Sequence, residues 1–328
     1  MENRNLETLA QELGLKKQQV ETVLELTAEG NTIPFIARYR KEKTGNLDET
    51  QIKAIIDMDK SLTALQDRKE TVLAKIEAQG KLTDQLKAAI EAAEKLADVE
   101  ELYLPYKEKR RTKATIAREA GLFPLARLIL QNSPNLKAEA EKLTSEAFPT
   151  ADKALAGAVD ILVEAFSEDN SLRSWTYNEI WNNSEITSIL KDQSLDEKET
   201  FKIYYDFEDK VSKLQGYRTL ALNRGEKLGV IKVAFKHNLE KMHRFYSARF
   251  KQKNDYIEEV INQSLKKKII PAMERRIRSE LTEAAEDGAI NLFSQNLRSL
   301  LLVSPLKGKM VLGFDPAFRT GAKLAVVD

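Results

Sequence analysis

Basic side chains able to bind phosphate are concentrated in one short stretch of an otherwise balanced chain. The chain has 52 Lys and Arg against 51 Asp and Glu, a formal net charge of +1. Between Tyr103 and Arg118, six basic residues accompany a single acid, Glu108. The six are Lys107, Lys109, Arg110, Arg111, Lys113 and Arg118. Cations gathered beside tyrosines suit an anionic partner such as a phosphate backbone, although a solvated connection between helices has the same composition.

Basic residues also gather nearer the N-terminus, in the stretch TIPFIARYRKEKTGNLDE, residues 32–49. Its cations, with Tyr39 among them, are Arg38, Arg40, Lys41 and Lys43. Pro34 suits the first turn of a helix, because the N–H that proline lacks would be unpaired there. Asn46, with Glu49 three residues on, predicts the N-cap of the helix that follows.

Composition excludes several classes of function. With 328 residues, the length allows about two domains. Charged residues at 31%, 13 Gly and 8 Pro are typical of a helix-rich protein. Without cysteine there is no disulfide framework, thiolate metal site or cysteine nucleophile, and the two histidines, His237 and His243, lack metal-ligand spacing. No signal peptide and no apolar run of ~18 residues is found, so we expect a cytoplasmic protein with no membrane contact and no cofactor.

Hydrophobic periodicity predicts helices through most of the chain. Leucines and valines before Gly30 predict two short helices parted by Gly14, which fit a helix-turn-helix DNA reader or an ordinary two-helix corner. Apolar residues from Ile52 to Ile76 recur at spacings of three, four and seven, which predicts one long helix. After Gly80 a matching stripe continues from residue 82 to residue 96. We therefore predict an αα-hairpin that carries the chain to the basic residues after Tyr103.

The second half is predicted to contain buried helices and one short strand. Residues 155–166 carry a buried helix face, and the pattern at 229–235 predicts a strand. Trp175 and Trp181 are interpreted as core or groove-filling residues. A long helix over 256–285 should be kinked or split by Pro271. Many of its cations face acids such as Glu274 and Glu280 at helical spacing, which predicts that most of them form surface ion pairs. These cations are Lys266, Lys267, Lys268, Arg275, Arg276 and Arg278.

The last twenty residues change to a β pattern. Met310 to Phe314 and Ala322 to Val327 predict two strands joined by a turn. Two strands alone are marginally stable in water, so we expect a chain that ends inside a domain.

Five stretches together resemble the Tex family of bacterial transcription accessory proteins. In chain order they are TIPFIARYRKEKTGNLDE (32–49), LPYKEKRRTKATIAREAGL (104–122), LALNRGEKLGV (220–230), IRSELTEAAE (277–286) and VLGFDPAFRTGAKLAVVD (311–328). The resemblance implies a mainly α fold. A multi-helix N-terminal region with long helical hairpins would occupy residues 1–303, with a helix-turn-helix-like start at 1–30. A linker and the first β-hairpin of an incomplete RNase H-like (YqgF) domain would follow at 304–328.

The same resemblance implies nucleic-acid binding and raises an enzymatic alternative. The family is associated with transcription, and its RNA-contacting S1 domain lies beyond the residues of this chain. In RNase H-like folds the first strand carries a metal-binding aspartate, a position that Asp315 matches. Asp315 and Asp328 alone do not build a two-metal nuclease site, which needs several converging carboxylates. Ala317 stands where the family's turn has glycine, and this weakens any close approach of that turn to a phosphate.

Three hypotheses therefore stand. The first is a non-catalytic nucleic-acid-associated scaffold, without metal or cofactor, whose two basic clusters contact phosphates of RNA or DNA. The second is a metal-dependent nuclease of RNase H-like type. The third is a protein-docking module for RNA polymerase or ribosome-associated machinery.

Overall fold

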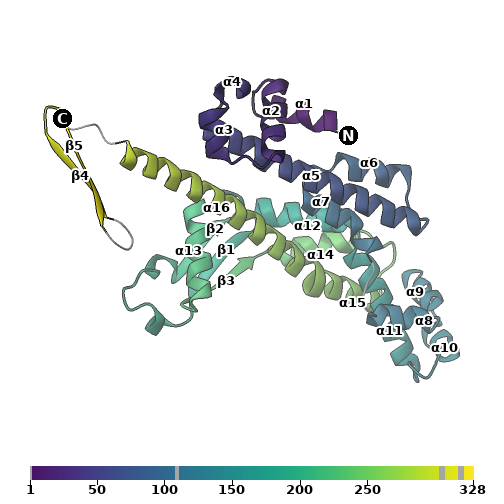
Figure 1. The fold of residues 1–328 in the computed structure, drawn as a ribbon. Coiled ribbons are helices and arrows are strands. Elements are labelled where there is room, and N and C mark those ends of the chain that lie inside the picture. The colour runs from purple at the N-terminus through teal and green to yellow at the C-terminus, as the bar shows by residue number, and fades with distance from the viewer. Residues whose placement is uncertain (1, 108–110, 303–306, 317–320) are drawn as a thin grey trace. The chain divides into compact units, whose positions relative to one another are not determined.

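The computed structural model describes residues 2–107, 111–302, 307–316 and 321–328, and it is mainly helical with small antiparallel sheets (Figure 1). The chain divides into two compact units. The N-terminal unit comprises Met1–Glu119 with Glu168–Asn170, and the C-terminal unit comprises Ala120–Ser167 with Ser171–Asp328. None of the helices in the described part of the chain is long and apolar enough to cross a membrane.

The N-terminal unit is built from helices around two apolar clusters. Its elements are α1 (Glu2–Glu12), α2 (Lys17–Ala28), α3 (Ile33–Tyr39), α4 (Lys41–Thr44), α5 (Glu49–Ala78), α6 (Asp84–Ala92), α7 (Leu96–Tyr103), the 3-10 turn η1 (Leu104–Tyr106) and α8 (Lys113–Glu119). The first cluster gathers buried residues of α1, α2, α3 and the start of α5. The second gathers the end of α5 with α6 and α7, through residues such as Val72, Ile76 and Ile90. Both clusters therefore share α5.

The predicted long helix is confirmed as α5, which runs for 30 residues. The predicted N-cap was wrong by two residues. Asp48, rather than Asn46, caps α5, because its carboxylate accepts from Gln51 N at 2.8 Å while Gln51 Oε1 accepts from Asp48 N at 3.1 Å. Asn46 has a left-handed φ of 64° and follows Gly45, φ 67°, so these two residues form the turn.

The predicted return helix is broken in two. α6 ends at Ala92, and Ala93, at φ −63° and ψ 131°, has an extended backbone that redirects the chain before α7 begins at Leu96. No glycine or proline marks this break in the sequence. The redirection lets Ile90 of α6 and Val99 of α7 pack in the same cluster at the end of α5.

The C-terminal unit contains the remaining α-helices. They are α9 (Phe123–Leu130), α10 (Leu136–Lys142), α11 (Ala151–Ser167), α12 (Asn170–Asn183), α13 (Gly216–Lys227), α14 (Leu239–Ser247), α15 (Asp255–Ser264) and α16 (Ile270–Leu301). The predicted buried face is confirmed, since α11 packs against α9, α10 and α15. Trp175 stacks on Phe245 with ring centroids 3.7 Å apart, consistent with a packing role.

A three-stranded antiparallel sheet of order β2-β1-β3 lies beside α13, with strands β1 (Glu185–Leu190), β2 (Asp206–Lys210) and β3 (Ile231–Lys236). Sequence analysis predicted β3 but neither β1, with which β3 pairs, nor β2 at the other edge of the sheet. Between these elements lie the 3-10 turns η2 (Gln193–Leu195), η3 (Lys202–Tyr204) and η4 (Val211–Lys213). Asp196 anchors this connection by accepting from Phe201 N at 2.7 Å, Thr200 N at 2.8 Å and the Tyr205 hydroxyl at 3.0 Å.

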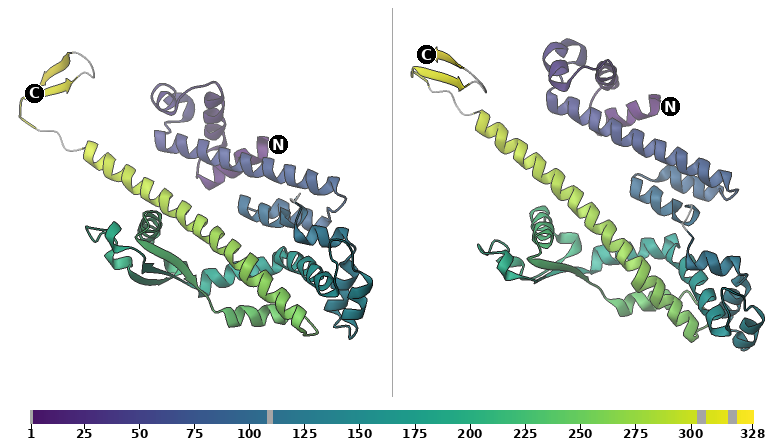
Figure 2. Two further views of the ribbon diagram at one scale, coloured as in Figure 1. Left: turned by 90° about the horizontal axis from the view of Figure 1, so that it is seen from below. Right: turned by 60° about the horizontal axis from the view of Figure 1, so that its bottom comes forward.

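Pro271 splits the predicted long helix, as expected. α15 ends at Ser264, a π-helical turn, η5 (Leu265–Ile269), follows, and α16 starts at Ile270 with Pro271 in its first turn. With 32 residues, α16 is about as long as α5, and both stand out in Figure 2. Its buried residues end at Ala285, and every residue from Glu286 to Leu302 is exposed.

The predicted terminal hairpin is confirmed as β4 (Val311–Pro316) and β5 (Ala322–Val327). The strands are antiparallel, with Leu312 opposite Val326 and Phe314 opposite Leu324. These four side chains are all exposed. No RNase H-like domain is seen among the described residues, and both Ala317 and the predicted domain boundary at 303–304 lie outside them.

Candidate nucleic-acid interface

The first basic cluster comprises Arg38, Arg40, Lys41 and Lys43, on α3, α4 and the residue between them. Apolar side chains hold this segment against the first apolar cluster of the N-terminal unit, because Ile36 and Ala37 are buried there with Leu47. Pro34 lies in the first turn of α3, as predicted. The cations therefore sit on an ordered helical corner rather than on an extended loop.

Within the described residues, none of these four cations has an acid within ion-pair distance. Arg38, Lys41 and Lys43 are exposed and Arg40 is half-buried. The Arg40 guanidinium lies over the Phe35 ring, 4.9 Å from its centroid, and donates to the Tyr39 carbonyl at 3.0 Å. Both contacts leave its charge uncompensated. Four such charges over six residues can neutralise phosphates.

An exposed aromatic ring lies within this cluster. Tyr39 is 66% exposed, with its ring centroid 5.3 Å from that of Phe35. A tyrosine among unpaired cations has the chemistry of a base-stacking platform on single-stranded nucleic acid.

The second basic cluster follows η1. Lys109 and Arg110 lie outside the described residues, so the structure places Lys107, Arg111, Lys113 and Arg118 of the predicted six. Lys107 and Lys113 are exposed and make no ion pair with any residue that the structure places. Arg111 pairs with Glu119 at 2.7 Å, which reduces the local positive charge. Thr112 caps α8 by accepting from Thr115 N at 3.0 Å.

The structure does not bring the two basic clusters together. The first packs beside the start of α5, whereas Tyr106, one residue before Lys107, accepts a hydrogen bond at 2.8 Å from Gln79, just beyond the end of α5. At about 1.5 Å per helical residue, the anchor points at Ile55 and Gln79 are roughly 35 Å apart. One nucleic acid would need about a full duplex turn to contact both clusters.

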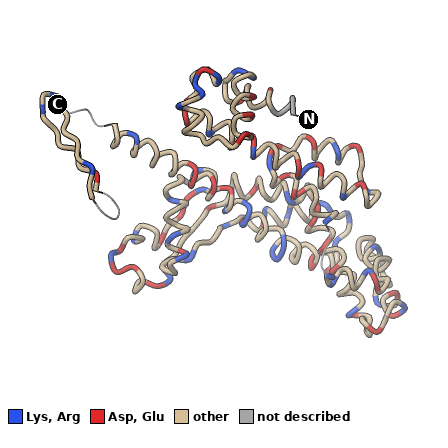
Figure 3. The backbone as a smooth tube through the Cα atoms, in the orientation of Figure 1, with Lys and Arg blue, Asp and Glu red and all other residues tan. Residues whose placement is uncertain are grey.

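The ion pairs predicted along α16 are confirmed only in part. Lys and Arg are interspersed with Asp and Glu along most of the backbone (Figure 3), and Arg276 pairs with Glu280 at 2.9 Å. Glu274, however, contacts His237 instead. Lys266, Lys267 and Lys268 are exposed in the π-helical turn and pair with no acid among the described residues, so the prediction was wrong for them. They form a third group of uncompensated cations that helical spacing alone did not reveal.

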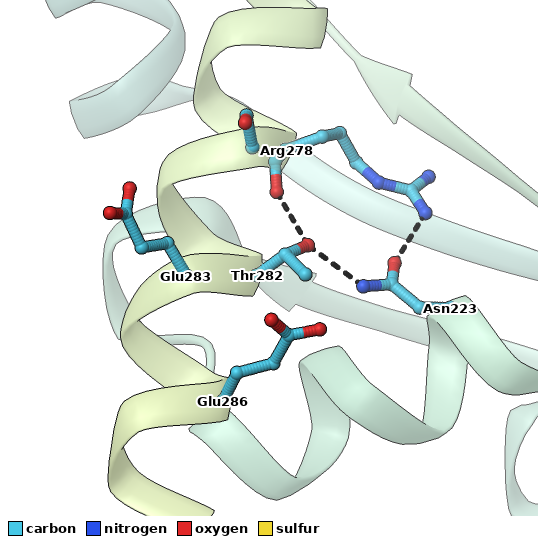
Figure 4. Close-up of a pocket in the computed structure, with 6 residues that line it drawn as sticks. Asn223, Arg278, Thr282, Glu283 and Glu286 are labelled. Carbon is cyan, nitrogen blue, oxygen red and sulfur yellow. Dashed lines mark hydrogen bonds between the residues drawn. The ribbon is translucent and has the colours of Figure 1, made fainter.

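Arg278 is committed to contacts between α13 and α16. It pairs with Glu226 at 2.8 Å. It also donates to Asn223 Oδ1 at 2.6 Å, while Asn223 Nδ2 donates to Thr282 Oγ1 at 2.8 Å (Figure 4). An open pocket of about 480 Å³ lies beside these side chains, with Glu283 and Glu286 also lining it. Arg278, the one cation among the described residues that line the pocket, is paired, and two exposed carboxylates also line it, so this pocket does not suit phosphate.

A serine, a histidine and a glutamate adjoin one another in the C-terminal unit. His237 shares a hydrogen bond at 2.9 Å with Ser184 Oγ through Nδ1, and its Nε2 lies 2.7 Å from Glu274. Ser184 is only 2% exposed, so a substrate does not reach its hydroxyl. The three side chains instead tie the ends of the sheet to α16.

Two parts of the chain match family models built from known proteins. Residues 3–77 match the Tex-like protein N-terminal domain, and residues 131–293 match the Tex central region-like family. The two matches cover more than half of the chain. The chain belongs to the Tex family. The N-terminal Tex match contains the first basic cluster and nearly all of α5, the central match contains the π-helical turn, and the second basic cluster lies between the two.

Relatives align with nearly the whole of this Tex chain. It is 45% identical to the uncharacterized protein YdcI of Bacillus subtilis and 40% identical to the transcriptional accessory protein Tex of Neisseria gonorrhoeae, each over 98% of the chain. The human S1 RNA-binding domain-containing protein 1 is 27% identical, again over 98% of the chain. The chain spans 46%, 44% and 34% of these relatives, so it covers less than half the length of each.

Proposed function

We propose that this chain is a non-catalytic, nucleic-acid-contacting scaffold of a transcription accessory protein. One observation carries the proposal: the cations of the first basic cluster are uncompensated and accompany an exposed tyrosine on a helical corner. The names of two relatives, a transcriptional accessory protein and an S1 RNA-binding domain-containing protein, agree with a nucleic-acid partner.

The contacts on which the proposal rests are to the phosphate backbone. Arginine and lysine contacts to phosphate provide affinity and orientation without reading sequence. Helices that are packed on α5 would present these charges in a fixed geometry, so that the rest of a Tex protein can act on a positioned strand. We propose that residues 1–303 form this helical scaffold and that the hairpin β4–β5 begins an RNase H-like sheet.

A salt titration tests the proposal. Binding of this chain to single- and double-stranded RNA and DNA of equal length would be measured between about 50 and 200 mM salt. Engagement of four phosphates predicts a log–log slope of about −2.8 on single strands and about −3.6 on duplexes. A slope near zero, or no binding at the low-salt end, would contradict the proposal. Retention of a polymerase or ribosomal protein that free nucleic acid does not displace would favour the docking hypothesis instead.

A cleavage assay addresses the nuclease hypothesis. Labelled single- and double-stranded substrates would be incubated with the chain and Mg²⁺ or Mn²⁺, beside an Asp315→Ala variant. In the hairpin register Asp315 lies opposite Lys323, an arrangement that serves strand pairing. We expect no cleavage with either protein. Cleavage that the variant abolishes would replace the scaffold proposal with the nuclease one.

A further inference from the structure

A groove lined by acidic and apolar side chains lies between α1, α2 and α5 of the N-terminal unit. Its volume is about 640 Å³. Leu6, Leu24 and Ile56 contribute apolar surface, and Glu21, Glu25 and Asp59 contribute carboxylates. Lys60 is the only cation among the described residues that line it. The groove is distinct from the basic clusters, because it contains no residue of α3, α4 or η1.

The three carboxylates of the groove are uncompensated. None of them makes a hydrogen bond or ion pair with another residue in the described ranges. Glu21 and Glu25 are four residues apart on α2, a spacing at which like charges destabilise a helix. Asp59 is half-buried, and this burial raises the pKa of its carboxyl group above the ordinary value. A cation supplied by a partner would relieve both unfavourable effects.

The shape of the groove restricts the partner further. The described part of the N-terminal unit contains only helices, so it offers no strand edge to which a peptide could add. A groove between helices that is lined by apolar side chains can bind the apolar face of an amphipathic helix. The carboxylates require Lys or Arg on the flanks of that helix, and they repel phosphate backbones.

We propose that this groove binds a basic amphipathic helical segment of a partner protein. Apolar side chains three or four residues apart would contact Leu24 and Ile56, and flanking Lys or Arg side chains would pair with Glu25 and Asp59. The N-terminal unit would then have two charge-opposed surfaces, one for phosphate and one for a basic peptide.

The test uses designed peptides. The probe is a fluorescein-labelled 14-residue helix with leucines at spacings of three and four and lysines elsewhere. A second peptide replaces every lysine by glutamate, and a third replaces every leucine by serine. Fluorescence anisotropy with the full chain should show saturable binding of the first peptide only. Equal binding of the serine peptide would mean non-specific charge attraction, and equal binding of the glutamate peptide would mean that the carboxylates play no part; either result overturns the proposal.

Matched variants locate the site. Asp59→Asn should weaken binding of the lysine–leucine peptide about fivefold or more, because it removes a half-buried ion-pair partner. Asp57→Asn, two residues away on α5 and outside the groove, should leave binding unchanged. Ala28→Trp, at an exposed position that lines the groove, should block the peptide. If Asp59→Asn binds as tightly as the parent chain, or Asp57→Asn weakens binding equally, the groove is not the site.

Discussion

Two groups of cations in this molecule differ in what surrounds them. In the N-terminal unit, Arg38, Lys41 and Lys43 have no acid within ion-pair distance among the described residues. On α16 of the C-terminal unit, Arg276 and Arg278 are paired with Glu280 and Glu226. Both groups consist of Lys or Arg side chains that lie close together in the sequence. The difference teaches that the fold, rather than the run of basic residues itself, decides which charges remain uncompensated.

The sharpest way to break this comparison is to neutralise the first basic cluster. A variant with Gln at positions 38, 40, 41 and 43 should bind nucleic acid up to about tenfold more weakly per lost phosphate contact at 0.1 M salt. The control neutralises four scattered exposed lysines without ion pairs among the described residues, namely Lys191, Lys198, Lys251 and Lys253. Both variants change the net charge from +1 to −3. Equal losses of affinity would show that only net charge matters.

Removing a paired cation should instead reduce the stability of the fold and leave nucleic-acid affinity unchanged. Arg278→Met leaves Glu226 without its cation and Asn223 Oδ1 without its donor, so we expect a loss of unfolding free energy of about 1–2 kcal/mol and unchanged nucleic-acid affinity. Denaturant unfolding measures the loss. Arg275→Met, an exposed neighbour on α16, should change stability by less than about 0.5 kcal/mol. A weaker affinity for Arg278→Met at full stability would contradict the division into paired and unpaired groups.

Within the first basic cluster, Tyr39 distinguishes binding of single strands from binding of duplexes. Tyr39→Ala should weaken binding of single strands by about 1–3 kcal/mol if its ring stacks on a base, and should leave duplex binding unchanged. Tyr39→Phe removes only the hydroxyl and should retain single-strand affinity. Equal effects of the alanine variant on single strands and duplexes would assign Tyr39 to structure rather than to stacking.

Two aspartates extend the comparison to acidic residues. Their replacement by asparagine should change the stability of the fold slightly and with opposite sign. Burial raises the pKa of Asp59, so its ionisation destabilises the fold as pH rises above the ordinary value of 3.8. Burial alone would raise the pKa of Asp196 too, but hydrogen bonds from Phe201 N, Thr200 N and the Tyr205 hydroxyl outweigh it and lower that pKa. Asp196 therefore stabilises the fold above its ordinary pKa, and this contribution is lost as pH falls through its lowered value.

Thermal unfolding at several pH values measures both aspartates. At neutral pH Asp59→Asn should be more stable than the parent chain and Asp196→Asn less stable. For Asp59→Asn the difference should vanish below about pH 4, where an ordinary aspartate is protonated, and for Asp196→Asn it should shrink at still lower pH. Shifts of the same sign for the two variants would contradict these assignments.

Local signals in the sequence predicted the helices well, and non-local contacts explain what was missed. Pro34 and Gly45 fix backbone geometry on their own, so the corner that carries the first basic cluster could be predicted. β2 could not, because Asp, Glu and Lys dominate its sequence and disfavour strands, and it forms by pairing with β1. In the antiparallel pairing of β1 with β2, Glu185 lies opposite Lys210.

The same distinction applies to the charges. The pair between Arg276 and Glu280, four residues apart, follows from helical spacing. The pair between Arg278 and Glu226 joins residues 52 positions apart and follows only from packing of α13 on α16. Glu274 contacts His237, 37 positions away in the sequence, which helical spacing alone does not predict. Whether a cation is free to bind a ligand is thus a property of the tertiary structure.

The sharing of α5 between two apolar clusters has a consequence for its dynamics. No residue of α5 from Asp57 to Thr71 is fully buried, whereas both ends of the helix are anchored by isoleucines and valines. Isolated helices fray from their termini, but here the termini are the protected parts. Backbone amide protons should therefore exchange with solvent faster near the centre of α5 than near Ile55 or Ile76. Bending at this central segment would change the distance between the two basic clusters without unfolding either apolar cluster.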